Sequence, residues 1–424
     1  MGIKTPITSL SYLSEEAFPI FSCFDYNSYL METLKSYFGT ANLSDFYTGA
    51  VAQRAISQRG REVAELVGNG RSIGIRLDNQ LAWTFRVEKE KVAIYEGADQ
   101  ASLVISSDGD SWSDLVTEAW SMMGLAIQGR IKIEHGSFNH LAKWEPALQA
   151  LYNDRPIWFP EKEEAIGTHA FSMNDDRKEM MNALSRLGFI LVRSVFVEEE
   201  IEMMRSEVEE RRQKASPEDK RSWWATNAQG EERCCRVTYL NYGSEFFSNL
   251  PNDSRLLTLA ALSERKLSPA PHHGDGVAVV IKVPGITEGL SDLPWHRDCG
   301  MGGHPLLCPG LNMGIQLDHA TAESGQLKFL AGSNNYSGGA DYANDSASVI
   351  PIEASPGDVT LHYGHTLHIA PPPIGGDNYR RTVYVSFHIP EYQNVLPEGQ
   401  GYNDVLFTHG DGRVRAPQER MGED

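Results

Sequence analysis

Cysteine is scarce in this chain, and its few cysteines do not have the spacing of a metal-binding or redox motif. The sequence contains Cys23, Cys234, Cys235, Cys299 and Cys308. An odd number, with two residues adjacent and no C-x-x-C, argues against a disulfide framework and against a zinc ribbon. We therefore expect free thiols in a reducing compartment, which predicts a cytoplasmic protein.

The chain also lacks an excess of positive charge, a long apolar run and a secretion signal. It has 38 Lys and Arg against 57 Asp and Glu, with a net charge of -19. An acidic surface repels nucleic acid and anionic membrane surfaces, so we expect neither as a partner. No apolar run reaches the roughly 18 residues of a membrane span. The start, "MGIKTPITSLSYLSEEAF", has no basic region followed by an apolar core, so we expect no signal peptide.

The length predicts more than one domain. With 424 residues, 41% of them hydrophobic, the chain exceeds one typical domain and can form large cores. We expect a first domain over residues 1–152 with its core at about 50–152. A linker over 153–171, with prolines, charge and little periodicity, then leads to a second domain over 172–392 and a polar, glycine-rich tail over 393–424. The sequence leaves open whether the protein forms a homo-oligomer.

The first domain has the pattern of a small sheet followed by helices. Alternating apolar residues over 71–97 predict three antiparallel strands, joined by "DNQ" and "EKEK", with one buried face. "ASLVISSD" adds a fourth strand, "SWSDLVTEAWSMMGLAIQG" has helical spacing, and "GRIKIEHGSFNHLAKWEPALQALY" predicts a short strand and a second helix. The region resembles sterol-carrier-protein-type lipid-binding domains, which implies an α+β fold around an apolar tunnel. The residues that would fill the core or line that tunnel are Trp83, Phe85, Trp112, Trp120, Met122 and Met123.

The second domain alternates short strands with turns. "MNDDRKEMMNALSRLGFILVRSVFVEEEIEMMRSEVEERRQ" predicts a helix, a strand at "FILV" and a second helix, with Gly188 between the first two. "GVAVVIKVPG", "LNMGIQLDHA", "GQLKFLAGSN", "ASVIPIEASPGDVTLHY" and "RRTVYVSFHI" then predict strands separated by Gly, Pro and Asn. Such a series favours an all-β sandwich or barrel with flanking helices.

A His-x-Asp pair offers two ligands to a divalent metal, and the chain has three such pairs. They are His273 with Asp275, His296 with Asp298, and His409 with Asp411. The first and third lie in H-G-D-G, which is typical of a turn. The pair at His296 instead follows a predicted buried strand and a Pro-Trp dipeptide. We therefore predict that this pair lies at the mouth of a strand and binds the metal.

A third ligand and an anion-binding residue follow in the order that iron oxygenases use. "GDVTLHYGHTLHIAPPP" offers His362, His365 and His368, and Arg380 comes twelve residues after the last. Two histidines and one carboxylate are the ligands of non-heme iron(II) oxygenases, and they leave coordination positions open. Arginine forms a bidentate pair with a carboxylate. Because neighbouring strand residues face opposite ways, either Arg380 or Arg381 faces the interior, but not both.

Residues 172–390 resemble the phytanoyl-CoA dioxygenase family of Fe(II)/2-oxoglutarate oxygenases. The resemblance is carried by "RLGFILVRSVFVEEEIEMMRSEV", "IKVPG…LPWHRD", "LNMGIQLDHATAESGQLKFLAGSNNYS" and "GDVTLHYGHTLHIAPPP…YRRTVYVSF". It implies a double-stranded β-helix (jelly roll) with Fe(II), 2-oxoglutarate and O2. It further implies His296, Asp298 and His368 as iron ligands, Arg380 as the 2-oxoglutarate arginine with Arg381 as the alternative, and Lys282 as a second cosubstrate contact.

This chain departs from the family pattern at two places, one near the expected cosubstrate and one in a Gly-Ser turn. The family commonly has H-G-S where this chain has His368-Ile369-Ala370, so a serine hydroxyl for 2-oxoglutarate is missing. Its P-G-S-H appears as "AGSN" at residues 331–334. Asp298 retains the carboxylate that related iron halogenases lack, which favours hydroxylation or another oxidation.

The sequence thus predicts an oxygenase that oxidises an unactivated C–H bond of an apolar small molecule, such as a lipid, a terpenoid or sterol-like compound, or a specialised metabolite. The apolar character follows from the sterol-carrier resemblance. Two alternatives stay open. One is a catalytically inactive lipid-binding or scaffolding protein, and the other is a cupin-like iron enzyme that does not use 2-oxoglutarate.

Overall fold

The computed structural model describes residues 49–390, except for 79–80, 117, 119–120, 128, 160–166, 218, 220, 228, 273–274, 289–292, 300–309, 342 and 375–378. These residues form two compact units. One holds the described residues up to Phe159 together with Tyr336–Gly339, and the other holds the remainder. Within these described ranges, every helix is too short or too polar to cross a membrane.

The N-terminal unit is built on a five-stranded sheet. In the order β3-β2-β1-β4-β5, its strands are β3 (Lys91–Glu96), β2 (Ala82–Glu88), β1 (Ser72–Leu77), β4 (Leu103–Ser107) and β5 (Ile131–His135). The predicted three-strand meander and the two later strands are confirmed. The sequence pattern did not predict that β1 pairs in parallel with β4, which makes β1 a central strand.

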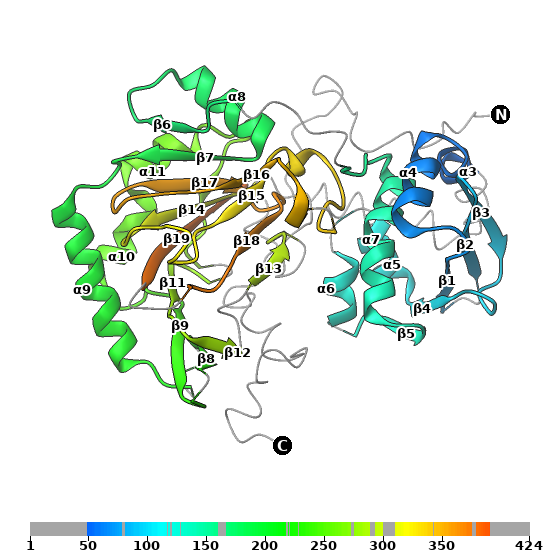
Figure 1. The fold of residues 1–424 in the computed structure, drawn as a ribbon, viewed down its shortest axis with the longest axis horizontal. Coiled ribbons are helices and arrows are strands. Elements are labelled where there is room, and N and C mark those ends of the chain that lie inside the picture. The colour runs from blue at the N-terminus through cyan, green and yellow to red at the C-terminus, as the bar shows by residue number, and fades with distance from the viewer. Residues whose placement is uncertain are drawn as a thin grey trace. The chain divides into compact units, whose positions relative to one another are not determined.

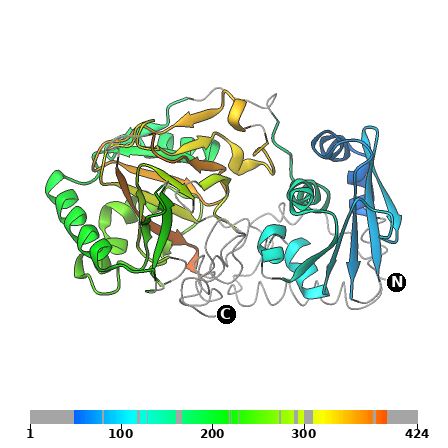
Figure 2. The same ribbon diagram turned by 60° about the horizontal axis from the view of Figure 1, so that its bottom comes forward.

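Helices lie against one face of this sheet (Figure 2). They are α3 (Ala50–Ala55), α4 (Gln58–Val67), α5 (Gly109–Val116), α6 (Met122–Ile127) and α7 (Phe138–Asn153). Phe85, Trp112 and Met122 are fully buried, while Trp120 and the side chain of Met123 lie outside the described residues. The region predicted as one helix after Ser111 forms two, α5 and α6.

Part of the opposite face, around the central strand β1, is also covered, so the prediction of a single buried face fails there and holds better for β2 and β3. A Cβ on Gly74 in β1 would lie 2.8 Å from the Cβ of Ala98 and 3.0 Å from that of Ala101. Those two alanines form a small buried cluster with Val104 of β4. Small side chains therefore let an irregular segment pack closely over the central strands.

The linker between the units is shorter than the predicted range of residues 153–171, because both ends of that range belong to folded units. Ile157, Trp158 and Phe159 are buried in the N-terminal unit, where Ile157 forms a parallel bridge with Ser337. The Trp158 amide donates to the Ser337 carbonyl at 2.9 Å. At the other end of the predicted linker, Ala170–Ser172 forms β6 of the second unit.

The second unit begins with the predicted helix, strand and helix. These are α8 (Arg177–Leu187), β7 (Phe189–Arg193) and α9 (Glu198–Lys214). Asp176 caps α8 by accepting from the amides of Lys178 and Glu179, and Gly188 ends it with φ of 83°. Two shorter helices, α10 (Glu245–Asn249) and α11 (Ser254–Ala260), follow, and Figure 1 shows α8 to α11 around one large sheet.

Two sheets form the body of this unit, as the predicted β-sandwich requires. The large sheet runs β12-β8-β9-β11-β19-β14-β17-β7-β6, and β10 pairs with β19. Apart from β6 and β7, its strands are β8 (Ser222–Asn227), β9 (Glu232–Val237), β10 (Ser268–Pro269), β11 (Ala278–Lys282), β12 (Ile286–Glu288), β14 (Leu311–Gln316), β17 (Val359–Tyr363) and β19 (Arg380–His388). The small sheet runs β13-β18-β15-β16, with β13 (Leu293–His296), β18 (His368–Ala370), β15 (Lys328–Leu330) and β16 (Val349–Pro351). The sequence pattern did not predict the hairpin of β8 and β9.

The large sheet has one apolar face and one polar face. Apolar residues alternate along β14, β17 and β19 and pack with residues of α8 and α9 in the main hydrophobic core; they include Leu311, Met313, Ile315, Val359, Leu361, Val383, Val385 and Phe387. The residues between them belong to the other face, since successive side chains in a strand point to opposite sides. These residues are Asn312, Gly314, Gln316, Thr360, His362, Arg380, Thr382, Tyr384 and Ser386. This polar inner face positions the candidate site.

Candidate metal and cosubstrate site

The two histidines predicted as metal ligands are direct partners across neighbouring strands. His296 at the end of β13 pairs with His368 at the start of β18, and their ring centroids lie 4.2 Å apart. Asp298 follows β13, and its amide donates to the Gly364 carbonyl at 2.8 Å. Gly364 is required there, since a Cβ would lie 2.6 Å from the Cys299 sulfur. Strand pairing and this close backbone contact thus bring three residues from two distant segments together.

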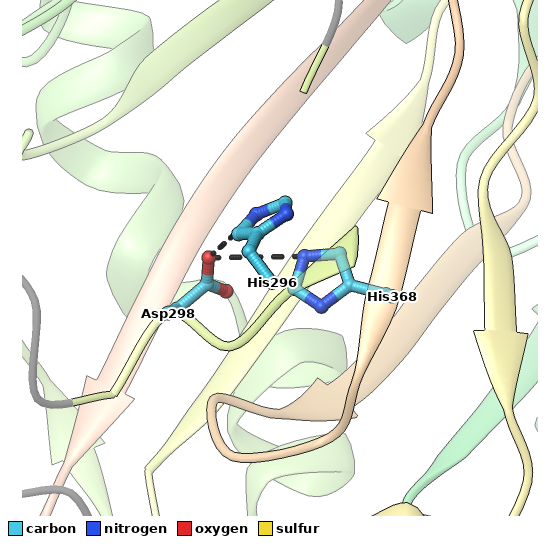
Figure 3. Close-up of side chains that lie close together, drawn as sticks. All are labelled: His296, Asp298 and His368. Atoms are coloured by element: carbon cyan, nitrogen blue, oxygen red, sulfur yellow. Dashed lines mark ion pairs between the residues drawn. The ribbon is translucent and has the colours of Figure 1, made fainter. Parts of the chain in front are cut away.

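The donor atoms of these three residues converge (Figure 3). Asp298 Oδ1 lies 3.4 Å from His296 Nε2 and 3.7 Å from His368 Nε2, and all three donor atoms lie within 4.8 Å of one another. Adjacent ligands of a metal at about 2.1 Å lie about 3 Å apart, so a small contraction completes the geometry. His362 and His365, which the sequence also offered as ligands, are not part of this group. His273 and His409 lie outside the described residues.

Arg297, between the two ligands, anchors the segment on its opposite side. Its guanidinium donates to the His365 carbonyl at 3.0 Å and to the Ser333 carbonyl at 3.3 Å. Alternation along an extended chain places His296 and Asp298 on one side and Arg297 on the other. The H-R-D sequence therefore combines two donors with a residue that fixes their backbone.

The protonation states of the group suit metal binding. His368 Nδ1 lies 2.9 Å from the Thr366 carbonyl, which only a protonated Nδ1 can hydrogen-bond, so Nε2 presents its lone pair to the site. Burial, with the neighbouring His296, lowers the pKa of His368 to about 3. Burial opposes ionisation of Asp298, but the nearby His368, His296 and His362 outweigh it and hold the pKa of Asp298 well below its usual range. A neutral imidazole and an ionised carboxylate are the ligand forms.

The second carboxylate oxygen of Asp298 is held by protein donors. Asn312 Nδ2 donates to Oδ2 at 2.7 Å, and His362 Nε2 lies 3.3 Å from the same atom. Ser386 donates to Asn312 Oδ1 at 2.7 Å, which fixes the orientation of the amide. Oδ1 is left to face the two imidazoles, so this arrangement favours binding of a metal through one oxygen. The sequence indicated His362 only as a candidate ligand and did not indicate Asn312 or Ser386. Both of these residues alternate with apolar residues along their strands, which places them on the inner face.

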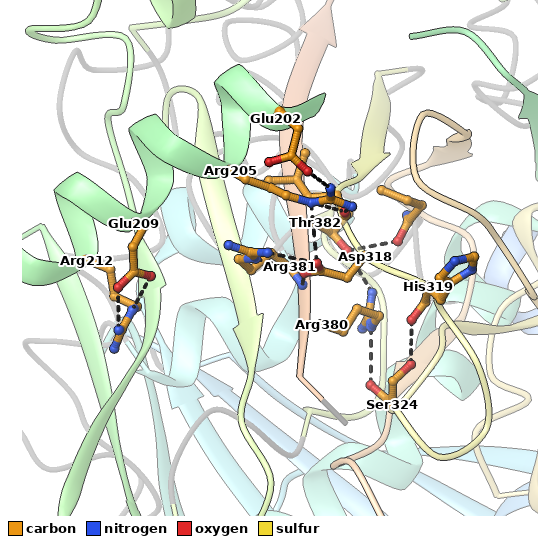
Figure 4. A network of polar contacts seen from close by, with 12 residues as sticks. Glu202, Arg205, Glu209, Arg212, Asp318, His319, Ser324, Arg380, Arg381 and Thr382 are labelled. Carbon is orange, nitrogen blue, oxygen red and sulfur yellow. Dashed lines mark hydrogen bonds and ion pairs between the residues drawn. The ribbon is translucent and has the colours of Figure 1, made fainter. Parts of the chain in front are cut away.

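The strand register separates the two arginines that the sequence left as alternatives. Arg380 faces inward and is buried, donating to the Gly325 carbonyl at 2.8 Å, to Thr382 Oγ1 at 2.7 Å and to the Ser324 carbonyl at 3.4 Å. Arg381 points the other way and forms a bidentate pair with Asp318 at 2.8 Å for both bonds. Figure 4 shows Arg381 with Asp318 and Arg205, apart from the Arg380 contacts.

Lys282 lies directly opposite Arg380 in the β11–β19 ladder, so the two side chains share one face of the sheet. Its side chain is fully buried, and Nζ donates to the Ala370 carbonyl at 2.5 Å. Ala370 is the residue that stands where the family has its serine. Like charges on directly opposed strand residues are destabilising, so this placement of two buried cations is costly unless negative charge lies nearby.

Other residues that the sequence singled out pack without a chemical role. Cys234 and Cys235 of β9 are buried, and burial raises the pKa of the Cys234 thiol to about 12, which keeps it protonated and unreactive. Cys299 is buried against Gly364. The Trp295 indole donates to Asn344 Oδ1 at 2.8 Å, which fixes it in the wall.

A two-sheet β-fold with a convergent His-Asp-His group defines a candidate non-heme metal centre. Residues 184–382 match the family described as Phytanoyl-CoA dioxygenase (PhyH). The match covers α8 through the first strand residues of β19 and contains every predicted site residue. This match therefore supports the family resemblance that the sequence motifs indicated for the C-terminal half of the chain.

Three solved structures with similar chains illustrate the likeness, one of them with nickel and 2-oxoglutarate bound and one with iron bound. AviO1 from Streptomyces viridochromogenes Tue57 is 24% identical, with 53% of this chain and 98% of that chain covered and a TM-score of 0.41. HygX from Streptomyces hygroscopicus, solved with nickel and 2-oxoglutarate, is 17% identical, with 50% and 87% covered and a TM-score of 0.39. EctD from S. alaskensis, solved with bound Fe, is 18% identical, with 55% and 83% covered and a TM-score of 0.42. No curated protein matches the chain.

None of these comparisons supports the predicted sterol-carrier-like domain over residues 1–152. The family region begins at residue 184, beyond the N-terminal unit. The order of strands and helices predicted for this unit is correct, but its relation to lipid carriers stays a prediction.

Proposed function

We propose that the protein is an Fe(II)- and 2-oxoglutarate-dependent oxygenase in which His296, Asp298 and His368 bind the iron. Arg380 binds the distal carboxylate of 2-oxoglutarate, and Lys282 contributes a second positive charge. The reaction class is oxidation of an unactivated C–H bond of a small molecule, by hydroxylation or a related outcome.

The observation that carries the proposal is a buried pair of cations on the same inner face as a convergent metal-ligand group. Arg380 donates to two carbonyls and to the Thr382 hydroxyl, and it also interacts with the Tyr384 side chain and, through its charge, with Asp318. Burial lowers the pKa of Arg380, because a buried guanidinium without a counter-charge is costly. A dicarboxylate would supply that counter-charge, and its other end would reach toward the metal ligands.

The donor set fits iron(II), since two neutral imidazoles and one carboxylate leave three positions open for a cosubstrate and dioxygen. When bound, iron(II) would activate dioxygen, which is the oxidant, and 2-oxoglutarate would be oxidised to succinate and CO2 alongside the substrate. The chain's own residues then have three tasks. His296, Asp298 and His368 hold the metal on one side, Asn312 and His362 keep Asp298 Oδ2 engaged, and Arg380 with Lys282 orients the dicarboxylate. Tyr384, on the same face of β19, interacts with Arg380.

Two alternatives make different demands on these residues. A catalytically inactive carrier does not need the His-Asp-His group to retain its donor geometry. An iron enzyme without 2-oxoglutarate gains nothing from placing Lys282 opposite Arg380. Both alternatives therefore leave the buried cation pair without a purpose, whereas a dicarboxylate cosubstrate accounts for it.

The apolar substrate predicted from the sequence rests on the sterol-carrier resemblance of residues 50–152. The inner face of the barrel is instead rich in hydrogen-bonding side chains, including Gln316, Thr360, Thr382 and Tyr384. These residues favour a substrate with polar groups. Delivery of an apolar ligand by the N-terminal unit stays a separate hypothesis, tested by titrating the full-length protein with a fluorescent fatty acid.

The test of the proposal is iron-dependent conversion of 2-oxoglutarate to succinate by the purified full-length protein under anaerobic reconstitution followed by exposure to air. We expect one iron per chain and slow succinate formation without an added substrate. The variants His296→Ala and His368→Ala should lose both iron and succinate formation. Retention of full iron binding by both variants would reject the assigned centre.

A further inference from the structure

A second charged group lies on the inner face of the large sheet, away from the cosubstrate cations. Arg236 of β9 pairs in register with Val280 of β11, which in turn pairs with Thr382 of β19. Thr382 is an inner-face residue that hydrogen-bonds Arg380. Arg236 therefore belongs to the same face as Arg380, two strands farther along the sheet, about 10 Å away at the backbone.

Arg236 forms a mostly buried ion pair with Asp275, whose side chain is 11% exposed against 17% for the arginine. Asp275 belongs to the first H-G-D-G segment, which the sequence indicated to be an ordinary turn. The guanidinium also lies over the Trp223 ring, 4.5 Å from its centroid, and Trp223 pairs in register with Arg236 across the β8–β9 hairpin. An aromatic ring and an ion pair thus occupy one patch of the inner face.

Each partner of this ion pair keeps an unused polar atom. Among the described residues, Arg236 Nε and Asp275 Oδ1 are buried and make no hydrogen bond. Leaving a buried charged group with an unmet hydrogen bond costs more than leaving a neutral one. One atom is a donor and the other an acceptor, and they belong to residues already in contact. A hydroxyl group satisfies both, since it accepts from an N–H and donates to a carboxylate.

Electrostatics place the pair within reach of the metal ligands. Burial raises the pKa of Asp275, while the charge of Arg236 lowers it and that of Asp298 raises it again. Burial raises the pKa of Tyr384, and the charges of Arg380, Asp298 and Arg236 also act on it. The ion pair therefore lies near enough to the candidate metal ligand Asp298 and to Tyr384 for their charges to interact.

We infer that Arg236 and Asp275, beside Trp223, form the substrate subsite of the enzyme and bind a hydroxyl group of a polyhydroxylated small molecule, of sugar or cyclitol type. This inference rests on the proposed function, because the metal site defines which part of the inner face receives substrate. A paired donor and acceptor for one hydroxyl suits a polyol, and the buried Trp223 ring holds the guanidinium in place from behind. A wholly apolar substrate would leave both polar atoms unmet.

Calorimetric titration of the full-length protein under nitrogen, with Fe(II) and 2-oxoglutarate present, tests the inference. The probes are methyl β-D-glucopyranoside and myo-inositol, and the fully O-methylated glucoside is a matched probe without donors. The variants are Asp275→Asn and Arg236→Lys. The control is Arg233→Lys, which changes an exposed arginine of the same hairpin that pairs with Glu231. We expect the wild type to bind at least one free polyol, and to bind the O-methylated glucoside at least tenfold more weakly than the free glucoside.

Either subsite variant should weaken polyol binding at least tenfold, and a far-UV circular dichroism spectrum like that of the wild type shows that the variant is folded. Arg233→Lys should change neither. The inference is overturned if no polyol binds, if the O-methylated glucoside binds as well as the free one, or if Asp275→Asn and Arg236→Lys bind like the wild type. Failure of the oxygenase proposal is seen separately, as an absence of iron binding or succinate formation in the wild type.

Discussion

The two units of this protein bury charged side chains in different ways. In the N-terminal unit, Glu118 is 4% exposed and forms a bidentate pair with Arg155 at 2.9 Å for both bonds. Glu62, also buried there, bonds Arg59 at 2.8 Å and the Ile157 amide at 3.2 Å. Each buried carboxylate therefore has a cation beside it, and both pairs hold segments of one unit together.

In the second unit, Lys282 and Arg380 are buried side by side with the same charge. Arg380 bonds neutral acceptors among the described residues, and Lys282 bonds a carbonyl. The contrast separates two uses of buried charge. A pair of opposite charge is explained by the fold that it supports, whereas the pair of equal sign is the feature from which we propose a bound dicarboxylate.

The largest effect should come from the candidate metal ligands. Replacing His296, Asp298 or His368 with Ala removes one of three protein donors, so substrate-free succinate formation should fall to background and iron binding should weaken strongly. His365→Ala is the matched control, because this histidine lies nearby but outside the donor group. Equal loss in that variant would show that the effect is not ligand removal.

Removal of the unbalanced arginine should impair cosubstrate binding. Truncating one partner of a buried charge pair costs about 2–5 kcal/mol, so Arg380→Met should raise the 2-oxoglutarate concentration for half-maximal succinate formation about 30-fold or more. Arg381→Met should leave that concentration near the wild-type value, since Arg381 pairs with Asp318 on the other face. The reverse result would exchange the two assignments.

The same contrast predicts opposite effects on stability. Arg155→Met leaves Glu118 buried without its cation and should lower the free energy of unfolding of its unit by about 3–5 kcal/mol. Arg380→Met removes a buried charge that lacks a counter-charge, so in the absence of 2-oxoglutarate it should leave stability unchanged or raise it. Urea denaturation followed by tryptophan fluorescence measures both. Equal destabilisation by the two variants would remove the distinction between the units.

A smaller effect is expected from the residues that hold Asp298 Oδ2. Asn312→Ala removes the 2.7 Å donor and should weaken iron binding about 10- to 100-fold, the usual cost of losing such a partner. Ser386→Ala should have a weaker effect, because Ser386 acts on Asp298 only through Asn312. Metal titration resolves the two, and an unchanged affinity in Asn312→Ala would show that Oδ2 does not need this donor.

The last prediction, small near neutral pH, is a dependence of metal-free stability on pH. Folding lowers the pKa of His368 from 6.5 to about 3. Between these two pH values the unfolded chain therefore binds a proton that the folded chain does not. Stability should fall as pH decreases from 6.5 toward about 3, by about 1.4 kcal/mol per pH unit at most. His368→Gln should flatten this slope. A slope that is identical in the variant would assign the effect to other groups.

Sequence patterns predicted strands well where apolar residues alternate and failed where partners are distant. The alternation in "LNMGIQ" and "RTVYVSF" identifies β14 and β19 directly, because one face packs against helices and the other is polar. The parallel pairing of β1 with β4 depends on segments that lie between them in sequence, so no local pattern could indicate it. The β8–β9 hairpin was missed because its residues, "SWWATN" and "ERCCRV", lack clean alternation.

The candidate site shows the same division. The order of His296, Asp298, His368 and Arg380 was visible in the sequence because each stands in a recognisable motif. Asn312 was not, since an asparagine inside a strand becomes meaningful only when the register places it beside Asp298. Asp275 was read as a turn residue because H-G-D-G is typical of turns, and only its ion pair with Arg236 across the sheet indicates otherwise.

The short segment Tyr336–Gly339 has a consequence for how the protein is made. It belongs to the N-terminal unit, where Ser337 bonds the Pro156 carbonyl and the Trp158 amide, yet it lies between β15 and β16 of the other unit in the chain. During synthesis domains usually fold in order as they emerge from the ribosome. Here the N-terminal unit acquires its last piece only after much of the second unit has been translated. The first half therefore cannot complete its fold until translation passes residue 339, and a stop codon before it would leave Ile157 and Trp158 without the segment that they bond.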